Sequence, residues 1–537
     1  MNFSKQNIAL CLLTIGTISI ILKISLVDFS LPVVNNDQLF SLRAISYIYG
    51  DFEINPKQNP GWPLFLSIFY RLFDSNDFLV YSNITRITSI LVSTLAIVPM
   101  YLLSRKFYDV KYSLVGASLL AFEPHINYRA GFGFTESLYI PIIILTIYFI
   151  LNKNNKLVYL SFIFAGLLWW TRLEGVVILF VITVIFFVVN KKSPKLILKY
   201  LLCLMIFALV VSPLLMQRYD QFDDPFYLYY NDHLFVEEYV GIGVKESEKT
   251  ASNYIEEQGI FKFVERFLLT GSSNVIEQTI RLSFPYLLIL LPFGLLFSLR
   301  PFDQNSSYIK ANWIVILVYS ACMIIPLAVI NERRFLFGLI PFIVIFSILP
   351  IQRVIEYGLN TFSFSKKQKN IFLVIILCII LLFSITYMLR YDLKSSDEEH
   401  EKIEFAHLLE NELDGIIMDP EFSRTFDHGY FSYAKLNNPP GNFKDFRILN
   451  DSVLHSGNQI VELHGKSIHE MISHGKSINA KYILVDTDNS QSFLDNIFNE
   501  KIDTPFLIKI YDTKEQGFNQ IDIKIFEIDY SLYDLDN

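Results

Sequence analysis

The stretch that decides the fold is IALCLLTIGTISIILKISLV at residues 8–27, which is followed by VVNNDQLFSLRA at residues 33–44. An α-helix of about 20 predominantly apolar residues is long enough to cross the hydrocarbon core of a bilayer. Runs of similar character recur along the chain and predict about eleven membrane spans, since a helix satisfies its own backbone hydrogen bonds in lipid. We place these spans near residues 8–27, 84–104, 112–127, 135–151, 157–171, 175–190, 196–216, 282–299, 312–330, 335–351 and 371–389.

The composition agrees with a membrane protein. Of the 537 residues, 52% are hydrophobic and only 18% are charged, with a mean hydropathy of +0.38. Soluble domains carry roughly 25% charged residues, so a soluble enzyme is disfavoured. The apolar content also excludes a disordered chain, and 4 Cys are too few for a disulfide framework. The predicted class is a polytopic α-helical membrane protein.

Lysine and arginine residues predict the orientation. They gather in alternate short loops, which the positive-inside rule makes cytoplasmic. The loops concerned contain Arg105, Lys106, Lys111, Lys153, Lys156, Lys191, Lys192, Lys195, Lys199, Arg300, Lys310, Arg353, Lys366, Lys367 and Lys369. With eleven spans the N-terminus is then cytoplasmic, and three long segments share the outer side: 28–83, 217–281 and 390–537.

Two domains are expected, a membrane domain at 1–390 and an acidic extracytoplasmic domain at 391–537. From Asp392 onward the chain has 28 acidic and 13 basic residues, a charge of −15, while the remainder carries +7. Helical patterns over 398–413 and 490–500 and β-like runs at 482–485, 506–511 and 521–528 predict a small α/β fold for this domain.

Asp37 is the first candidate site residue. It follows the first span by about ten residues, Arg43 lies six positions further on, and residues 38–50 have the periodicity of a helix lying along the membrane surface. The Pro-rich stretch at 59–65 then returns the chain to the bilayer. A carboxylate at this position is also a common helix N-cap, and that alternative stays open on position alone.

This arrangement resembles the polyprenyl-phosphate-dependent GT-C glycosyltransferases, a superfamily that includes protein O-mannosyltransferases, lipid A aminoarabinose transferases and the catalytic subunit of oligosaccharyltransferase. The resemblance covers roughly residues 1–390. It implies that Asp37 is the catalytic base or the group that orients the acceptor. The second acid that often follows in this superfamily is Gln38 here.

Two further outer junctions match the same superfamily. The loop from Phe122 to Leu138 contains Glu123, Arg129 and Glu136, and Glu136 corresponds to the acid that opens the fourth helix. The resemblance implies a catalytic role for Glu136 and substrate binding for Glu123 and Arg129. The structural alternative is that Thr135 and Glu136 cap a helix whose positive N-terminal end favours a carboxylate.

The turn Thr171-Arg172-Leu173-Glu174-Gly175 resembles another recurrent element of these enzymes, and Arg172 and Glu174 become substrate-binding candidates. Its structural alternative is a self-contained Arg172–Glu174 ion pair.

Arg333 and Arg334 lie on the predicted outer side, against the positive-inside trend. A guanidinium fork matches phosphate oxygens, and the resemblance implies that this element holds the lipid phosphate through Arg333 or Arg334. The alternative is that these arginines only anchor the chain to lipid headgroups. Arg218 fits the arginine that follows the seventh helix, and Arg43 and Arg218 are further substrate-binding candidates. Nearby Asp223 and Asp224 are weak candidates for a divalent cation, with a solvated turn as the alternative.

The implied function is inverting transfer of a hexose or pentose from a polyprenyl-phosphate-linked donor to a protein, lipid or glycan acceptor at the outer face of the cell membrane. We expect no required cofactor and no nucleic-acid partner, and the surrounding partners are membrane lipids. The rival hypotheses are a transporter or flippase of lipid-linked sugars and a non-catalytic scaffold that displays the C-terminal domain. A transporter should have related halves with paired broken helices, and the sequence shows no such repeat.

Overall fold

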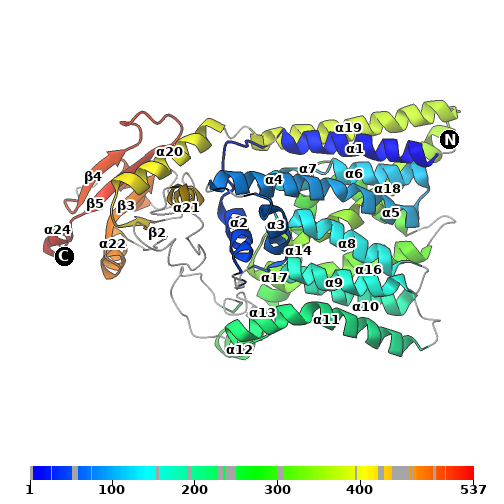
Figure 1. Cartoon of the computed structure of the whole chain (residues 1–537), viewed down its shortest axis with the longest axis horizontal. Helices are drawn as coiled ribbons and strands as arrows, with labels where there is room; N and C mark the ends of the chain where they lie inside the picture. The colour runs from blue at the N-terminus through cyan, green and yellow to red at the C-terminus, as the bar shows by residue number, and fades with distance from the viewer. Residues whose placement is uncertain are drawn as a thin grey trace.

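A computed structural model gives the fold of the chain. It describes residues 4–536 except 26, 51, 53–57, 74, 76, 153–155, 190–194, 228–233, 236–249, 300–305, 393–395, 421–427, 438–458, 463, 464, 466, 488–491, 502 and 503. A long helical body is followed by a smaller domain with a β-sheet, which lies at one end of that body (Figure 1). We call residues 396–536 the C-terminal domain and the end of the helical body nearest to it the domain-facing end.

The first half of the helical body runs from the N-terminus to a 27-residue helix. Its elements are α1 (Lys5–Ile24), α2 (Asn35–Ile48), α3 (Gly61–Tyr70), α4 (Phe78–Leu95), α5 (Ile97–Phe107), α6 (Val110–Ala121), α7 (Pro124–Phe132), α8 (Glu136–Ile150), α9 (Leu157–Thr171), η1 (Leu173–Val176), α10 (Val177–Val189) and α11 (Leu196–Phe222).

The second half returns to the domain-facing end and closes with α19. Its elements are α12 (Ala251–Gln258), α13 (Ile260–Val264), η3 (Glu265–Thr270), α14 (Gly271–Ser283), α15 (Leu287–Ser298), α16 (Ser306–Cys322), α17 (Ile324–Val329), η4 (Arg333–Leu339), α18 (Ile340–Glu356), η5 (Gly358–Asn360) and α19 (Lys366–Asp392). Helix α18 is central, and every residue from 340 to 351 is buried.

Each predicted span coincides with one of these helices or with a consecutive pair. Among the residues that the structure describes, five helical segments are long and apolar enough to cross a membrane, and they are Lys5–Ile24, Phe78–Phe107, Leu196–Phe222, Arg333–Asn360 and Lys366–Arg390. The pair Ile260–Ser283 and Leu287–Ser298, bent by 114°, would form a sixth as a broken span, and the other apolar helices are shorter. The protein is an integral membrane protein, while the count of eleven crossings and the orientation stay predictions.

One predicted boundary is wrong. The span expected at 112–127 ends at Ala121, and a separate short helix, α7, begins at Pro124. Glu123 is the N-cap of α7, where its Oε2 accepts a hydrogen bond of 2.7 Å from the Ile126 amide, and proline is favoured in the first turn that follows. Helix α7 ends at Gly133 with φ of 90°, and a Cβ there would clash with the side chain of Thr85, so this turn requires glycine. The polar α7 therefore joins α6 to α8 at the domain-facing end.

The C-terminal domain has the predicted α/β character. Its elements are α20 (Ser396–Glu412), β1 (Ile416–Asp419), α21 (His428–Asn437), β2 (Gln459–Glu462), α22 (Ile468–Ser477), β3 (Ala480–Asp486), α23 (Ser492–Phe498), β4 (Leu507–Asp512), β5 (Ile523–Ile528) and α24 (Tyr530–Asp536). The strand order is β2-β1-β3-β5-β4, in which β2, β1 and β3 are parallel and β5 is antiparallel to both neighbours.

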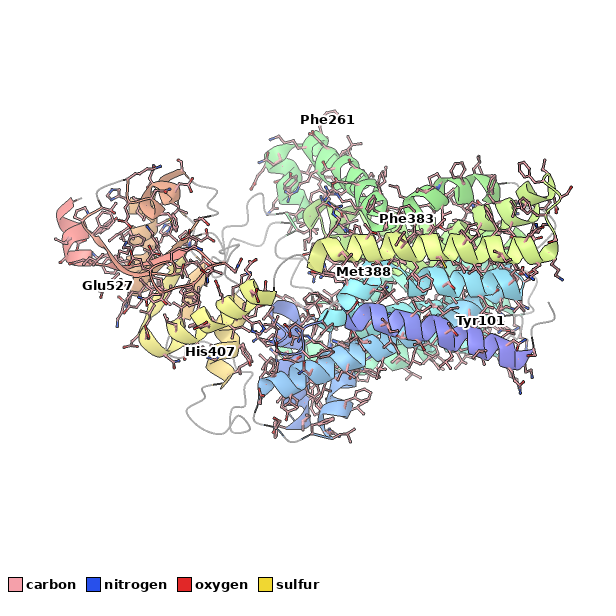
Figure 2. All side chains as sticks on the ribbon, turned by 90° about the horizontal axis from the view of Figure 1, so that it is seen from above. Tyr101, Phe261, Phe383, Met388, His407 and Glu527 are labelled. Atoms are coloured by element: carbon pink, nitrogen blue, oxygen red, sulfur yellow. The ribbon has the colours of Figure 1, made fainter. Side chains whose placement is uncertain are left out.

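Successive side chains along the strands point to opposite faces of this sheet, and each face has its own apolar cluster. Ile417 and Leu484 pack with residues of α20 and α21 on one face. Met418 and Ile483 pack with α22 and α23 on the other. Helices α20 and α21 therefore form a layer between the sheet and the helical body. Figure 2 shows α20, labelled at His407, reaching from the sheet toward the helical body, whose far end carries Tyr101.

Candidate functional site

Asp37 lies in the first turn of α2, and its carboxylate is buried. Its exposed fraction is 4%, and its Oδ1 is buried without a hydrogen-bond partner. The N-cap of α2 is Val34, which makes no side-chain cap bond. The alternative that Asp37 caps this helix is therefore wrong, and the buried oxygen is left for another partner.

Charged side chains from four other elements surround Asp37. Burial, and then the negative charge of Glu136, raise the pKa of Asp37 well above its usual range, while Arg129, Arg334 and Arg86 oppose that rise. A buried carboxyl with a raised pKa beside a specific set of charges is typical of a functional site.

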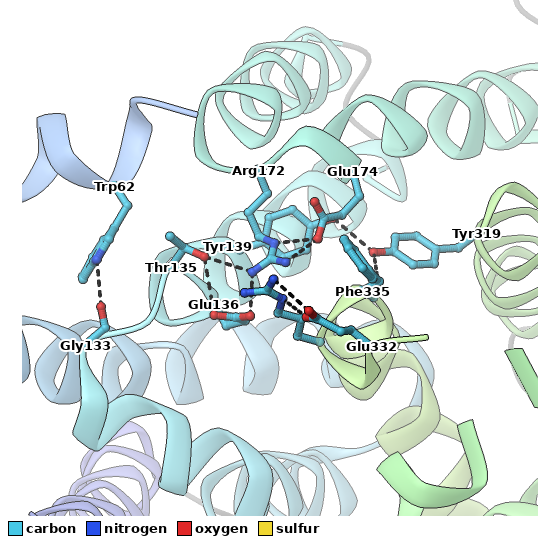
Figure 3. Close-up of polar contacts among 11 residues, drawn as sticks. Trp62, Gly133, Thr135, Glu136, Tyr139, Arg172, Glu174, Tyr319, Glu332 and Phe335 are labelled. Carbon is cyan, nitrogen blue, oxygen red and sulfur yellow. Dashed lines mark hydrogen bonds and ion pairs between the residues drawn. The ribbon is translucent and has the colours of Figure 1, made fainter. Parts of the chain in front are cut away.

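Glu136, at the start of α8, is held by an ion pair across two loops (Figure 3). The guanidinium of Arg172 lies 2.5 Å from a Glu136 oxygen and 2.5 Å from a Glu174 oxygen, and its Nη1 also donates to the Thr135 hydroxyl at 3.0 Å. Thr135 makes no side-chain cap bond to α8. The capping alternative holds in part, because Thr135 occupies the N-cap position without a side-chain bond and Glu136 lies in the first turn of α8. The alternative of a self-contained Arg172–Glu174 pair is wrong, because Arg172 is shared between two carboxylates.

Arg129 and Arg334 approach Glu136 closely enough to act on it electrostatically, as they do on Asp37. Arg129 lies over the ring of Phe134 at 4.4 Å. Arg334 pairs with Glu332 and lies 5.9 Å from the ring centroid of Phe335. The structure thus brings together two carboxylates and two arginines that the sequence places on three separate junctions.

Glu123 and Arg333 form a second, adjacent cluster. Glu123 is buried, with Oε1 unpartnered, and it interacts electrostatically with Arg333 and with Lys23 of α1. Arg333 Nη1 is 3.4 Å from His125 Nδ1, and the Arg333 Nε is buried without a hydrogen-bond partner. Arg333 and Lys23 give this cluster positive charge at the same end of the bundle as Asp37, and an anionic ligand would need such charge.

The remaining candidates lie apart from these clusters. Arg43 is half-buried on α2 with its Nη1 unpartnered. Arg218 is buried on α11 and donates to Asn59 Oδ1 at 2.6 Å and to the Tyr227 carbonyl, so it ties α11 to the loop before α3. Substrate binding by Arg43 and Arg218 stays a prediction.

The acids after α11 form a turn. Asp223 is the C-cap with φ of 57°, and Asp224 Oδ1 accepts from the Phe226 amide at 2.8 Å. Within the described residues, no three His, Cys, Asp or Glu side chains gather as a group that could hold a metal ion. The turn interpretation fits Asp223 and Asp224, and a divalent cation stays untested.

Two cations at the site were not proposed from the sequence. Arg86 of α4 is buried and donates to the carbonyls of Asp28, Leu31 and Pro32. Lys23 of α1 is buried beside Glu123 and donates to Ser19 at 2.5 Å. Each is a single cation inside a predicted span. A charge within the membrane costs free energy, so this position is the sequence signal that could have marked both residues as candidates.

Residues 57–216 match the family described as dolichyl-phosphate-mannose-protein mannosyltransferase. No curated protein matches the sequence. Among solved structures, the oligosaccharyltransferase of Archaeoglobus fulgidus in the apo form is similar with a TM-score of 0.55 and 14% identity, covering 91% of this chain and 70% of that one. ArnT from Cupriavidus metallidurans bound to undecaprenyl phosphate is similar with a TM-score of 0.55 and 9% identity, covering 96% of this chain and 97% of that one.

The chain has a GT-C fold. The resemblance inferred from its sequence is confirmed, and the matching family and the structural neighbours are glycosyltransferases of the GT-C type. The same Archaeoglobus fulgidus enzyme has also been solved with an inhibitory peptide and a dolichol-phosphate, and with Zn and sulfate. For this chain, the donor, the acceptor and any cofactor are not determined by that likeness.

Proposed function

We propose that this GT-C membrane protein is an inverting glycosyltransferase that moves a hexose or pentose from a polyprenyl-phosphate-linked donor to a protein, lipid or glycan acceptor at the outer face of the cell membrane. The observation that carries the proposal is the buried Asp37 carboxylate, whose Oδ1 has no hydrogen-bond partner and which lies among arginines on a GT-C fold. A non-catalytic scaffold has no need for such a carboxylate. A transporter should carry its ionisable residues inside its spans, whereas Asp37 lies in α2, outside the predicted spans.

Asp37 is the proposed general base. Inverting transfer needs a group that takes the proton from the acceptor as the acceptor attacks the anomeric carbon, and a positioned side chain of suitable pKa supplies this. Burial and the negative charge of Glu136 raise the pKa of Asp37, and a raised pKa makes its carboxylate a stronger base. Glu136, held by Arg172, is proposed to set the charge around Asp37 and to orient the acceptor.

The arginines are proposed to bind the phosphate of the donor. As the bond from sugar to phosphate breaks, negative charge develops on the polyprenyl phosphate, and prepositioned guanidinium groups stabilise that charge in a site that excludes water. We assign this role to Arg129, Arg333 and Arg334, which interact electrostatically with Asp37, Glu123 or Glu136, and Arg172 supports it by pairing with Glu136. A lipid-linked donor is supported by the neighbours, one of which is bound to undecaprenyl phosphate and another to a dolichol-phosphate.

The test is transfer by the purified protein. We expect that a panel of radiolabelled polyprenyl-phosphate hexoses and pentoses, incubated with a membrane extract as acceptor, yields free polyprenyl phosphate together with label in a new glycosidic linkage. Chromatography of the lipid and of the acceptor fraction measures both products. If the protein in liposomes instead moved the intact labelled donor across the bilayer and formed no new linkage, the transporter hypothesis would replace ours.

The pH dependence of transfer tests the role of Asp37. We expect kcat/KM to rise with pH along a limb whose midpoint lies above the usual aspartate pKa of about 3.9, because a base must be deprotonated and the pKa of Asp37 is raised by burial and by Glu136. Glu136→Gln removes one of the charges that raise this pKa, so the limb should move to lower pH. Glu174→Gln is the control, since Glu174 is not among the charges acting on Asp37. A limb that stays in place or moves upward in Glu136→Gln would assign the titration to another group.

A further inference from the structure

The segment that leads into Asp37, residues 28–34, is bound through its backbone by α4. Asn83 Nδ2 donates to the Phe29 carbonyl at 3.0 Å. Arg86 donates to the Asp28 carbonyl at 2.8 Å, to the Pro32 carbonyl at 3.1 Å and to the Leu31 carbonyl. Two side chains of α4 therefore fix four backbone carbonyls of one short segment, and a buried arginine with three carbonyl acceptors is a strong, geometrically specific anchor.

The side chains of the same segment meet the C-terminal domain. His400 Nε2 of α20 lies 3.5 Å from Asp28 Oδ2 and 3.3 Å from the Ser30 hydroxyl. Val34 packs against the apolar cluster that contains Phe405 of α20 and Tyr430 of α21. The segment thus lies between α4 on its backbone side and α20–α21 on its side-chain side.

Helix α21 continues this contact onto the helical body. Tyr433 and Leu436 are buried in one cluster with Val33, with residues of α2 that include Phe40, and with Phe78 of α4. The rings of Tyr433 and Phe78 have centroids 6.3 Å apart at 53°. Figure 1 shows α21 beside α2 and α4, on the side of the C-terminal domain that faces the helical body. The C-terminal domain therefore packs on the helical body through buried apolar side chains, in addition to its covalent connection through α19.

We propose that α20 and α21 of the C-terminal domain are positioning elements for Asp37, which they hold in place by closing the 28–34 segment against Arg86 and Asn83. Asp37 lies three residues beyond Val34, so any shift of this segment moves the carboxylate. A misplacement of about 1 Å at a reacting group can lower a rate by about 10²-fold. The kinetic consequence rests on the proposed function, whereas the structural consequence does not.

The experiment compares, in the full-length protein, residues of α21 buried against the helical body with a residue buried on the far face of the sheet. Tyr433→Ala and Leu436→Ala remove side chains from the contact with α2 and α4. Tyr533→Ala is the matched control, because Tyr533 is equally buried in the C-terminal domain but packs in the cluster on the opposite face. We expect amide hydrogen exchange over residues 28–40 to become at least about tenfold faster in the first two variants and to stay at the wild-type rate in the control.

We expect the two alanine variants to lower kcat without a comparable change in KM. In Tyr433→Ala and Leu436→Ala, kcat should fall about tenfold or more while the KM for the donor changes by less than about twofold. Leu436→Met should keep both kcat and the exchange rate at wild-type values, because methionine keeps the apolar volume. Unchanged exchange in both alanine variants would overturn the proposal, as would equal acceleration in Tyr533→Ala or faster exchange with unchanged kcat. If wild-type protein shows no transfer, the proposed function fails, and the exchange data still decide whether the segment is held by α20 and α21.

Discussion

Asp37→Asn is expected to lower kcat for sugar transfer by about 10²- to 10⁴-fold, the range in which a positioned general base contributes. The amide has nearly the same shape as the carboxylate but cannot accept a proton at neutral pH. In steady-state assays the loss should fall on kcat, while the KM for the lipid-linked donor changes little, because the proposed phosphate contacts come from arginines on other elements.

The fold should survive this substitution. A buried carboxylate with an unpartnered oxygen costs free energy when it is ionised, so replacing it with a neutral amide should leave the melting temperature unchanged or raise it. Asp77→Asn is a matched control at the same end of the bundle. Asp77 is the N-cap of α4 and accepts from the Leu79 amide at 2.8 Å, a role that asparagine performs equally well. Asp37→Asn with near-normal kcat would remove Asp37 from the chemistry and leave Glu136 as the candidate base.

The helical body was largely predictable because its signal is local. Apolar runs located each span, and Asp37 stood out because a carboxylate just beyond a span has to be accounted for. The break at Glu123 and Pro124 was missed because apolar residues on both sides hid a nine-residue polar helix. In the C-terminal domain, three strands and two helices were predicted, whereas the four-residue strands β1 and β2 are too short to give a periodic pattern.

The site was predictable as a set of residues but not as an arrangement. Glu136 and Arg172 are 36 residues apart, and neither periodicity nor spacing indicates that they form one ion pair. The sequence suggested Arg172 with Glu174, which is half of the observed contact. The position of Arg86 inside a predicted span was a usable signal, but its role could not be predicted, because it binds backbone carbonyls of residues 28–32 and such acceptors leave no mark in a sequence.

The shared ion pair leads to the second large effect, in Arg172→Met. Arg172 is the cation between two buried carboxylates, so its removal leaves Glu136 and Glu174 as like charges without the ion pair that joins them. Breaking a buried pair in this way typically costs about 3–5 kcal/mol. We expect a loss of this size in the free energy of unfolding from denaturant titration in detergent, with transfer activity lost as well because Glu136 is no longer held.

The two carboxylates provide the control for this prediction, because the trio as a whole carries one negative charge in excess. Glu174→Gln and Glu136→Gln each leave Arg172 with one carboxylate, so the buried charge becomes balanced and each should cost clearly less stability than Arg172→Met. The two variants should differ in activity, since Glu136 acts on Asp37 and Glu174 does not. If Arg172→Met were as stable as the glutamine variants, the carboxylates would have to be neutral or solvated in the folded protein. A site built on their fixed charge would then be excluded.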